Sequence, residues 1–256
     1  MLKFHQLKVN LLTRISGENS EPKDETLQGK PVIRDDLEPI PPRMAGLPID
    51  ERGYPVPWFV PSIDGKPEFR ALDQEKWLCA VEEKRCWVCG ELLGVYKCFV
   101  AGPMCGINRT SSEPPSHVDC GRWSARNCPF LSNPDMVRRE DGAINATTMR
   151  ENTAGIAIRR NPGVTMLWIT REFEVILDGD RKPLLVMGEP HSVEWWYRKR
   201  LATREEVLRS IETGLPALEA VAAQEPGGLL ALQRCQKRIE KFLPAGASLR
   251  LDPENE

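Results

Sequence analysis

Four residues in the middle of this sequence have the types and the spacing that a metal ion requires. Cys86 and Cys89 are separated by two residues, so both thiolates can reach one ion from a tight turn. His117 and Cys120 are three residues apart, and on a helix this spacing puts both side chains on one face of the first turn. The complete pattern is C-x2-C-x27-H-x2-C. Four protein ligands close the coordination, so we expect one structural Zn2+ per chain.

The remaining cysteines leave other ligand sets open. Seven of the eight cysteines lie between residues 79 and 128, and in a reducing compartment this clustering favours metal ligands over disulfides. Cys105 or Cys128 could replace His117 as a ligand, or an iron–sulfur cluster could use four thiolates. Cys235 stands apart, on the apolar stripe of a predicted C-terminal helix, and is expected to be a core residue.

Three predicted elements bring the four ligands together. Gly90 follows the second cysteine and lets the chain turn in a left-handed conformation. Residues 92–102 follow a strand–turn–strand pattern and predict a short hairpin. Ser116 is a good N-cap for a helix that begins at residue 117 and ends before the next proline. This helix would hold both downstream ligands at its start, where the helix dipole favours a thiolate.

A cysteine knuckle, a hairpin and a helix that supplies two ligands resemble the treble-clef zinc finger, over about residues 85–130. The arrangement also resembles uncharacterised bacterial proteins associated with phages or plasmids. Treble clefs occur in HNH nucleases, in ribosomal proteins and in modules that bind proteins or nucleic acids. HNH nucleases carry a general-base histidine in the hairpin, whereas residues 92–102 contain no histidine. The resemblance therefore implies a structural zinc and a binding role, and it departs from the nuclease pattern.

For the whole chain we expect an α+β fold, in which the treble-clef zinc subdomain lies beside an antiparallel β-meander with C-terminal helices. Composition and periodicity divide the chain into four segments. These are a flexible arm at 1–30, a Pro-rich strap with a hairpin and a short helix at 31–84, the zinc subdomain at 85–150, and the β-meander with the helical region at 151–256.

Turn signals and periodicity locate the elements of the first half and the strands. Nine prolines between residues 31 and 67 favour an extended strap, which is expected to pack over the core through Trp58 and Phe59. Asp64-Gly65 predicts a hairpin turn, and residues 73–84 predict a helix. The meander is predicted from four strand-like runs, at residues 155–160, 164–170, 173–178 and 183–188.

The last third of the sequence is predicted to be helical. Thr203 and Glu206 form a capping box at the start of one helix, and the triplet Gly214-Leu215-Pro216 is expected to stop it. A second helix follows Gly228. Its apolar face consists of Leu232, Cys235, Ile239 and Phe242, and Pro244 is expected to end it.

The charge distribution limits the classes of partner. The chain has 35 basic and 37 acidic residues, and its net charge of −2 excludes a histone-like protein that coats polyanions. Residues 84–160 hold 11 basic and 7 acidic side chains, a net charge of +4, in the same stretch as the predicted metal ligands. We therefore expect a non-enzymatic binding protein that contacts nucleic acid or acts within a nucleic-acid-handling complex. The predicted nucleic-acid contacts are Lys97, Arg109, Arg122, Trp123 and Arg126.

Two other functions stay open. A protein–protein adaptor could use the Pro-rich strap together with the cluster Trp195-Trp196-Tyr197. A metal-dependent hydrolase or nuclease could use His191 as a general base, with Glu189 and Glu194 near it in the sequence. The sequence contains neither a Gly-rich phosphate loop nor a nucleophile elbow.

The sequence also bears on location. No stretch approaches the length of about 18 apolar residues that a membrane helix needs. The first 20 residues lack the apolar core and cleavage site of a signal peptide. We therefore expect a cytoplasmic protein that does not contact a membrane.

Overall fold

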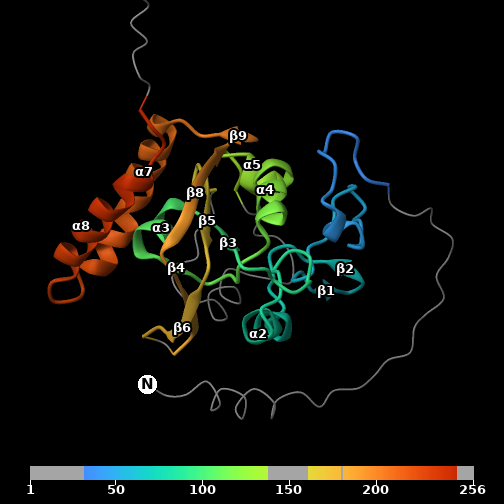
Figure 1. Cartoon of the computed structure of the whole chain (residues 1–256), viewed down its shortest axis with the longest axis horizontal. Coiled ribbons are helices and arrows are strands. Elements are labelled where there is room, and N and C mark those ends of the chain that lie inside the picture. Colours follow the sequence, from blue (N-terminus) through green and yellow to red (C-terminus); the bar gives the residue numbers. More distant parts are fainter. Residues whose placement is uncertain (1–31, 138–160, 180, 247–256) are drawn as a thin grey trace, which may run out of the picture. The chain divides into compact units, whose positions relative to one another are not determined.

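The computed structural model describes residues 32–137, 161–179 and 181–246, which form an α+β fold of helices and antiparallel sheets (Figure 1). The predicted arm at 1–30 and the first predicted strand, at 155–160, lie outside the described residues. Within the described part of the chain, no helix combines the length and the apolar character needed to cross a membrane.

A four-stranded antiparallel sheet forms the centre of the fold. Its order is β3 (Lys97–Ala101), β5 (Thr165–Thr170), β8 (Pro190–Tyr197) and β9 (Arg200–Leu201). Every residue of β5 is buried, and β3 pairs with one edge of this strand and β8 with the other. The short apolar run of β5 is typical of a strand that is buried on both faces.

The sequence pattern does not predict β8, because this strand begins with Pro190 and two polar residues that are typical of a loop. Proline is tolerated as the first residue of a strand. Ile169 of β5 pairs with Ser192 and Thr170 pairs with Pro190, which leaves His191 without an opposite residue. His191 is therefore the extra residue of a β-bulge, a feature that redirects a side chain.

The predicted four-strand meander is wrong as a single sheet. β6 (Phe173–Leu177) and β7 (Pro183–Met187) form the expected hairpin, but with β4 (Thr110–Ser111) they make a separate sheet in the order β4-β7-β6. The chain changes sheet between β5 and β6, where the backbone N–H of Gly188 donates to the carbonyl of Glu172 at 3.1 Å. Sequence periodicity locates strands, but it does not say which edges meet.

The hairpin predicted for residues 92–102 is also wrong. Only Lys97–Ala101 form a strand there, β3, and its antiparallel partner is β5. The residues before it turn back toward the knuckle, where Leu92 forms an isolated bridge with Arg85. On the other edge of β3, Cys98 and Ser116 exchange two backbone hydrogen bonds of 2.8 Å. β3 thus fixes the start of the ligand helix next to the central sheet.

The C-terminal helices are confirmed, with one correction. Thr203 and Glu206 form the predicted capping box at the start of α7 (Arg204–Ala222). The predicted stop is wrong, because α7 continues through Pro216. Packing overrides the local signal: Gly214 is buried, and a Cβ atom there would lie 3.0 Å from the side chain of Met104.

A second C-terminal helix, α8 (Gly228–Ile239), is followed by the 3-10 turn η3 (Glu240–Phe242). As predicted, one face of α8 packs inward, with Leu232 and Ile239 buried. Both α7 and α8 contact α3 (Pro103–Asn108), a short helix that the sequence pattern does not predict (Figure 1).

The Pro-rich strap contains the 3-10 turn η2 (Pro42–Met44) and a small hairpin of β1 (Ser62–Ile63) and β2 (Lys66–Pro67). The predicted turn is confirmed: Asp64 and Gly65 connect these strands with φ values of 51° and 76°. The predicted helix is also confirmed as α2 (Gln74–Glu82), capped by Asp73.

Phe59 of the strap stacks on Trp87 of the knuckle, with ring centroids 4.6 Å apart and planes 6° apart. The neighbouring Trp58 donates its backbone N–H to the carbonyl of Val88 at 2.7 Å. These contacts confirm the expected packing of the strap, and they place it directly over the cysteine knuckle.

Candidate metal centre

Four side chains converge on one point between the knuckle, the strap and α4 (Val118–Asn127). They are the four predicted ligands, and their ligand atoms all lie within 4.8 Å of one another. The side chains of Cys86 and Cys120 are fully buried, His117 is 7% exposed and Cys89 is partly exposed. Three sulfurs and one imidazole nitrogen at this separation can hold a metal ion.

The knuckle is preformed around the first cysteine. Sγ of Cys86 accepts backbone hydrogen bonds from Cys89 at 3.4 Å and from His117 at 3.3 Å, and such donors favour a thiolate. Gly90 completes the turn with φ of +80°, and a Cβ atom there would lie 2.8 Å from the ring of Trp58. Glycine is therefore needed both for the left-handed backbone and for close packing of the strap.

His117 is held so that one ring nitrogen faces the cluster. Nδ1 lies 3.4 Å from Sγ of Cys89, and Nε2 lies 3.0 Å from the backbone carbonyl of Leu92. Nε2 donates its proton to the carbonyl of Leu92, so Nδ1 is the ring nitrogen that can bind an ion once it has lost its own proton. His117 is itself the N-cap of α4, one residue later than the predicted cap, Ser116. Cys120 then lies in the first turn of α4.

The close contacts in the cluster shift the pKa values of Cys86, His117 and Cys120. Burial opposes ionisation of Cys86, but hydrogen bonds from Cys120, Cys89 and His117 outweigh it and lower the pKa of the thiol. The hydrogen bond to Cys86, followed by the one to Cys89, raises the pKa of His117 to about 10. The same partners and burial raise the pKa of Cys120. Without an ion, Cys86 is therefore favoured as a thiolate, while His117 and Cys120 tend to keep their protons.

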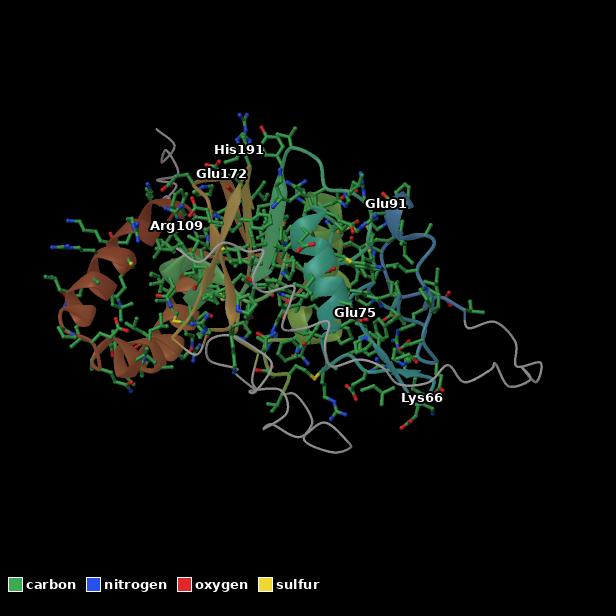
Figure 2. All side chains as sticks on the ribbon, turned by 90° about the horizontal axis from the view of Figure 1, so that it is seen from below. Lys66, Glu75, Glu91, Arg109, Glu172 and His191 are labelled. Carbon is green, nitrogen blue, oxygen red and sulfur yellow. The ribbon has the colours of Figure 1, made fainter. Side chains whose placement is uncertain are left out.

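A cation from the strap lies beside the cluster and was not predicted from the sequence. Arg43 follows the first residue of η2, and its guanidinium is 2.9 Å from a carboxylate oxygen of Asp119 and 3.6 Å from one of Glu91. The hydrogen bond to Asp119 and the nearby cysteines Cys120 and Cys89 raise the pKa of Arg43. Figure 2 shows Glu91 beside the strap. Arg43 thus links strap, knuckle and α4, and no local motif around it predicts this.

The alternative cysteine ligands lie outside the cluster. Cys105 is on α3, and Cys128 is the C-cap residue of α4. Neither belongs to the group that converges within 4.8 Å. Cys98 of β3 is fully buried, and this burial raises the pKa of its thiol. Cys235 is partly buried on α8.

Three of the five predicted nucleic-acid contacts are arginines that pair with carboxylates. Nε of Arg122 lies 3.0 Å from Glu194, and Nε of Arg126 lies 2.9 Å from Glu38. Arg109 likewise pairs with Glu189, at 2.5 Å. Carboxylates far away in the sequence therefore neutralise these three arginines, and their role as nucleic-acid contacts stays a prediction. Of the predicted cations, Lys97 has no carboxylate partner within the described chain, and its Nζ donates to the carbonyl of Val95 at 3.0 Å.

The tryptophans proposed as binding residues are buried. Trp123 of α4 is 5% exposed, and its Nε1 donates to the carbonyl of Glu38 at 3.1 Å, so it cannot stack on a base. Trp195 and Trp196 of β8 are buried as well, so the adaptor hypothesis loses two of its three aromatic docking residues, and only Tyr197 is partly exposed. Large aromatic side chains fill the core here because they remove much apolar area from water.

His191 is separated from the acids that were expected to assist it. Its imidazole is exposed and packs on Tyr96, with ring centroids 4.6 Å apart (Figure 2). Glu189 pairs with Arg109, and Glu194 pairs with Arg122. Neither carboxylate is therefore available to orient the imidazole as a general base.

We expect no hydrolysis that depends on His191. Purified protein and the His191→Ala variant should cleave fluorescent DNA and RNA at the same background rate with Mg2+, Mn2+ or Zn2+ present. Activity that disappears only in the variant would revive the hydrolase hypothesis.

The arrangement can do one kind of chemistry directly, which is to hold a metal ion through four buried or partly buried ligands. Comparison with protein-family models, with curated proteins and with solved structures finds no match for this chain.

Proposed function

We propose that this chain is a zinc-stabilised, non-enzymatic binding protein in which the metal is structural. The observation that carries this proposal is the convergence of Cys86, Cys89, His117 and Cys120, whose ligand atoms lie within 4.8 Å of one another. Thiolates and imidazole are the ligands that Zn2+ takes in structural sites, and four of them leave no open position for a substrate.

A treble-clef subdomain remains our proposal for the architecture around the metal. A knuckle supplies two ligands and the start of α4 supplies the other two, which supports this proposal. The hairpin of that motif is replaced here by β3 and its pairing with β5. The metal would join the strap, the knuckle and the central sheet, because each of them contacts the segments that carry the ligands.

Metal analysis tests the zinc assignment. Protein purified without chelator should contain about one zinc per chain, and a strong chelator should remove it and lower the melting temperature.

Zinc affinity should weaken as the pH falls. In the metal-free cluster His117 has a pKa of about 10 and keeps its proton at neutral pH, so zinc binding must displace that proton. Competition with a chromogenic chelator at pH 6, 7 and 8 should show about a tenfold change per pH unit for each proton released. If the purified protein contained no zinc and added zinc did not change its melting temperature, the assignment would be wrong.

The partner class that we propose is nucleic acid. Support comes from exposed or partly exposed cations without carboxylate partners among the described residues, of which Lys97 is one. A pull-down from cell extract with and without nuclease tests this proposal. Loss of the captured material after nuclease treatment is the expected result, whereas capture that survives nuclease and high salt would favour a protein–protein adaptor.

A further inference from the structure

Four cations gather on the outer side of the last helix. Arg234, Lys237 and Arg238 of α8 and Lys241 of η3 are all exposed, and we refer to them as the basic face. Their spacing is that of positions i, i+3, i+4 and i+7, which lie on one side of a helix. The opposite side of α8 is buried against the protein through Leu232 and Ile239.

The basic face is not neutralised in the way that the other predicted cations are. Within the described residues, none of its four side chains forms an ion pair with a carboxylate. Nη2 of Arg238 is 3.1 Å from Sγ of Cys235, and Nζ of Lys241 lies 4.9 Å from the ring centroid of Phe242. Between residues 228 and 246 the only acidic residue is Glu240. Positive charge therefore dominates this surface, although the whole chain has a net charge of −2.

A small pocket lies at the C-terminal end of the basic face. Arg238 and Lys241 line it, together with Arg109, its ion-pair partner Glu189 and the aromatic side chains of Trp168 and Phe242. The guanidinium of Arg109 is fixed there by its donation to the carbonyl of Met187 at 2.9 Å. In Figure 2, Arg109 lies between the C-terminal helices and the sheet. One of the cations predicted from the sequence thus lies beside the basic face instead of beside α4.

We infer that the basic face of α8 is the surface through which this protein contacts the phosphate backbone of nucleic acid; this inference rests on the proposed function. From Arg234 to Lys241 the helix rises by about 10 Å, at about 1.5 Å per residue. Duplex DNA carries one phosphate per about 3.4 Å of axis along each strand, so this length spans about three phosphates of one strand and about six of both strands. The four cations on this rigid helix are enough to face the phosphates of one strand over that length.

Nucleic acid fits this surface better than a membrane does. A helix that lies on a membrane inserts its apolar face among the lipids. In α8 that face is occupied by the protein core, since Leu232 and Ile239 are 7% and 4% exposed. Leu229 and Leu230 at the start of α8 are also exposed, but two leucines are far less than the continuous apolar face that inserts into lipid. From Arg234 to Lys241 the outward side carries the four cations, which can contact phosphates directly.

The test compares two variants that remove the same charge from different surfaces. Arg234→Gln with Lys237→Gln takes two charges from the basic face, and glutamine keeps the helix propensity of α8. Arg171→Gln with Lys199→Gln is the matched control, because both cations are exposed, lie outside the basic face and are not among the predicted nucleic-acid contacts. Binding of a fluorescent duplex and of a single strand is measured by polarisation between 50 and 200 mM salt. Zinc content and circular dichroism confirm that all proteins are equally folded.

The wild-type slope of log K against log salt on duplex should be about −3.6, for about −0.9 per phosphate and four contacts. The basic-face variant should bind at least tenfold more weakly at the lowest salt, with a slope shallower by about 1.8, and the control variant should bind like the wild type. If the wild type binds no nucleic acid, the proposed partner class is wrong and the inference fails with it. If the wild type binds and the basic-face variant binds equally well, the inference alone fails. Binding to anionic phosphatidylserine vesicles without binding to nucleic acid would also overturn it.

Discussion

Replacing Cys89 by alanine is expected to abolish stoichiometric zinc binding and to destabilise the N-terminal half of the described fold. Cys89 is one of four ligands whose atoms lie within 4.8 Å of one another, and its Sγ is 3.4 Å from Nδ1 of His117. With three ligands left, water must complete the coordination and the closed site becomes an open one.

The expected effect is large because a structural metal ion contributes directly to folding. Structural zinc supplies on the order of 10–16 kcal/mol in small zinc-finger peptides, whereas a whole domain is stable by only about 5–15 kcal/mol. Losing even a third of the metal contribution would therefore remove several kcal/mol. Trp58 and Phe59, which pack over the knuckle, should become accessible to solvent together with the metal ligands.

Cys128→Ala is the matched control, because Cys128 ends α4 but lies outside the ligand cluster. Elemental analysis should find about one zinc in the control and none in Cys89→Ala. Hydrogen exchange should show increased exchange in residues 56–60 and 86–93 of the Cys89 variant alone. Zinc lost from the control, or kept by Cys89→Ala, would mean that the ligand set is wrong.

The ligands could be predicted from the sequence because each pair is set by local geometry. Cys86 and Cys89 belong to one turn, and His117 and Cys120 belong to the first turn of one helix. The capping box of α7 and the Asp64-Gly65 turn were predictable for the same reason. In each case the residues that determine the structure lie within four positions of one another.

What could not be predicted depends on contacts between distant segments. β3 pairs with β5, which lies more than 60 residues later in the sequence. The sequence of neither strand indicates which other strand it pairs with. Arg122 and Glu194 are 72 positions apart, so their ion pair is invisible before the fold is known. The net charge of a sequence segment therefore overestimates the positive charge of the folded surface, because distant carboxylates can pair with its cations.

The stretch around Trp195 shows the same limit for aromatic residues. Three aromatic residues in a row suggest an exposed docking cluster when the strand they belong to is not recognised. In the structure, Trp195 lies on β8 opposite Met166 of β5 and is 3% exposed. Its Nε1 donates to the carbonyl of Phe242 at 2.8 Å, which ties the central sheet to the turn after α8.

Trp195→Ala should therefore destabilise the protein by about 3–5 kcal/mol, the usual cost of removing a large aromatic side chain from a core. Part of this cost arises because the carbonyl of Phe242 loses its donor, and the rest arises from the cavity left between β8 and η3. Tyr197→Ala is the control from the same cluster: Tyr197 is only partly buried and lies near Arg198 and Arg200, so its loss should cost much less. Chemical denaturation of both variants measures the difference. If Trp195→Ala left the free energy of unfolding unchanged but abolished binding to a protein partner, the side chain would be a docking residue and the buried position described above would be wrong.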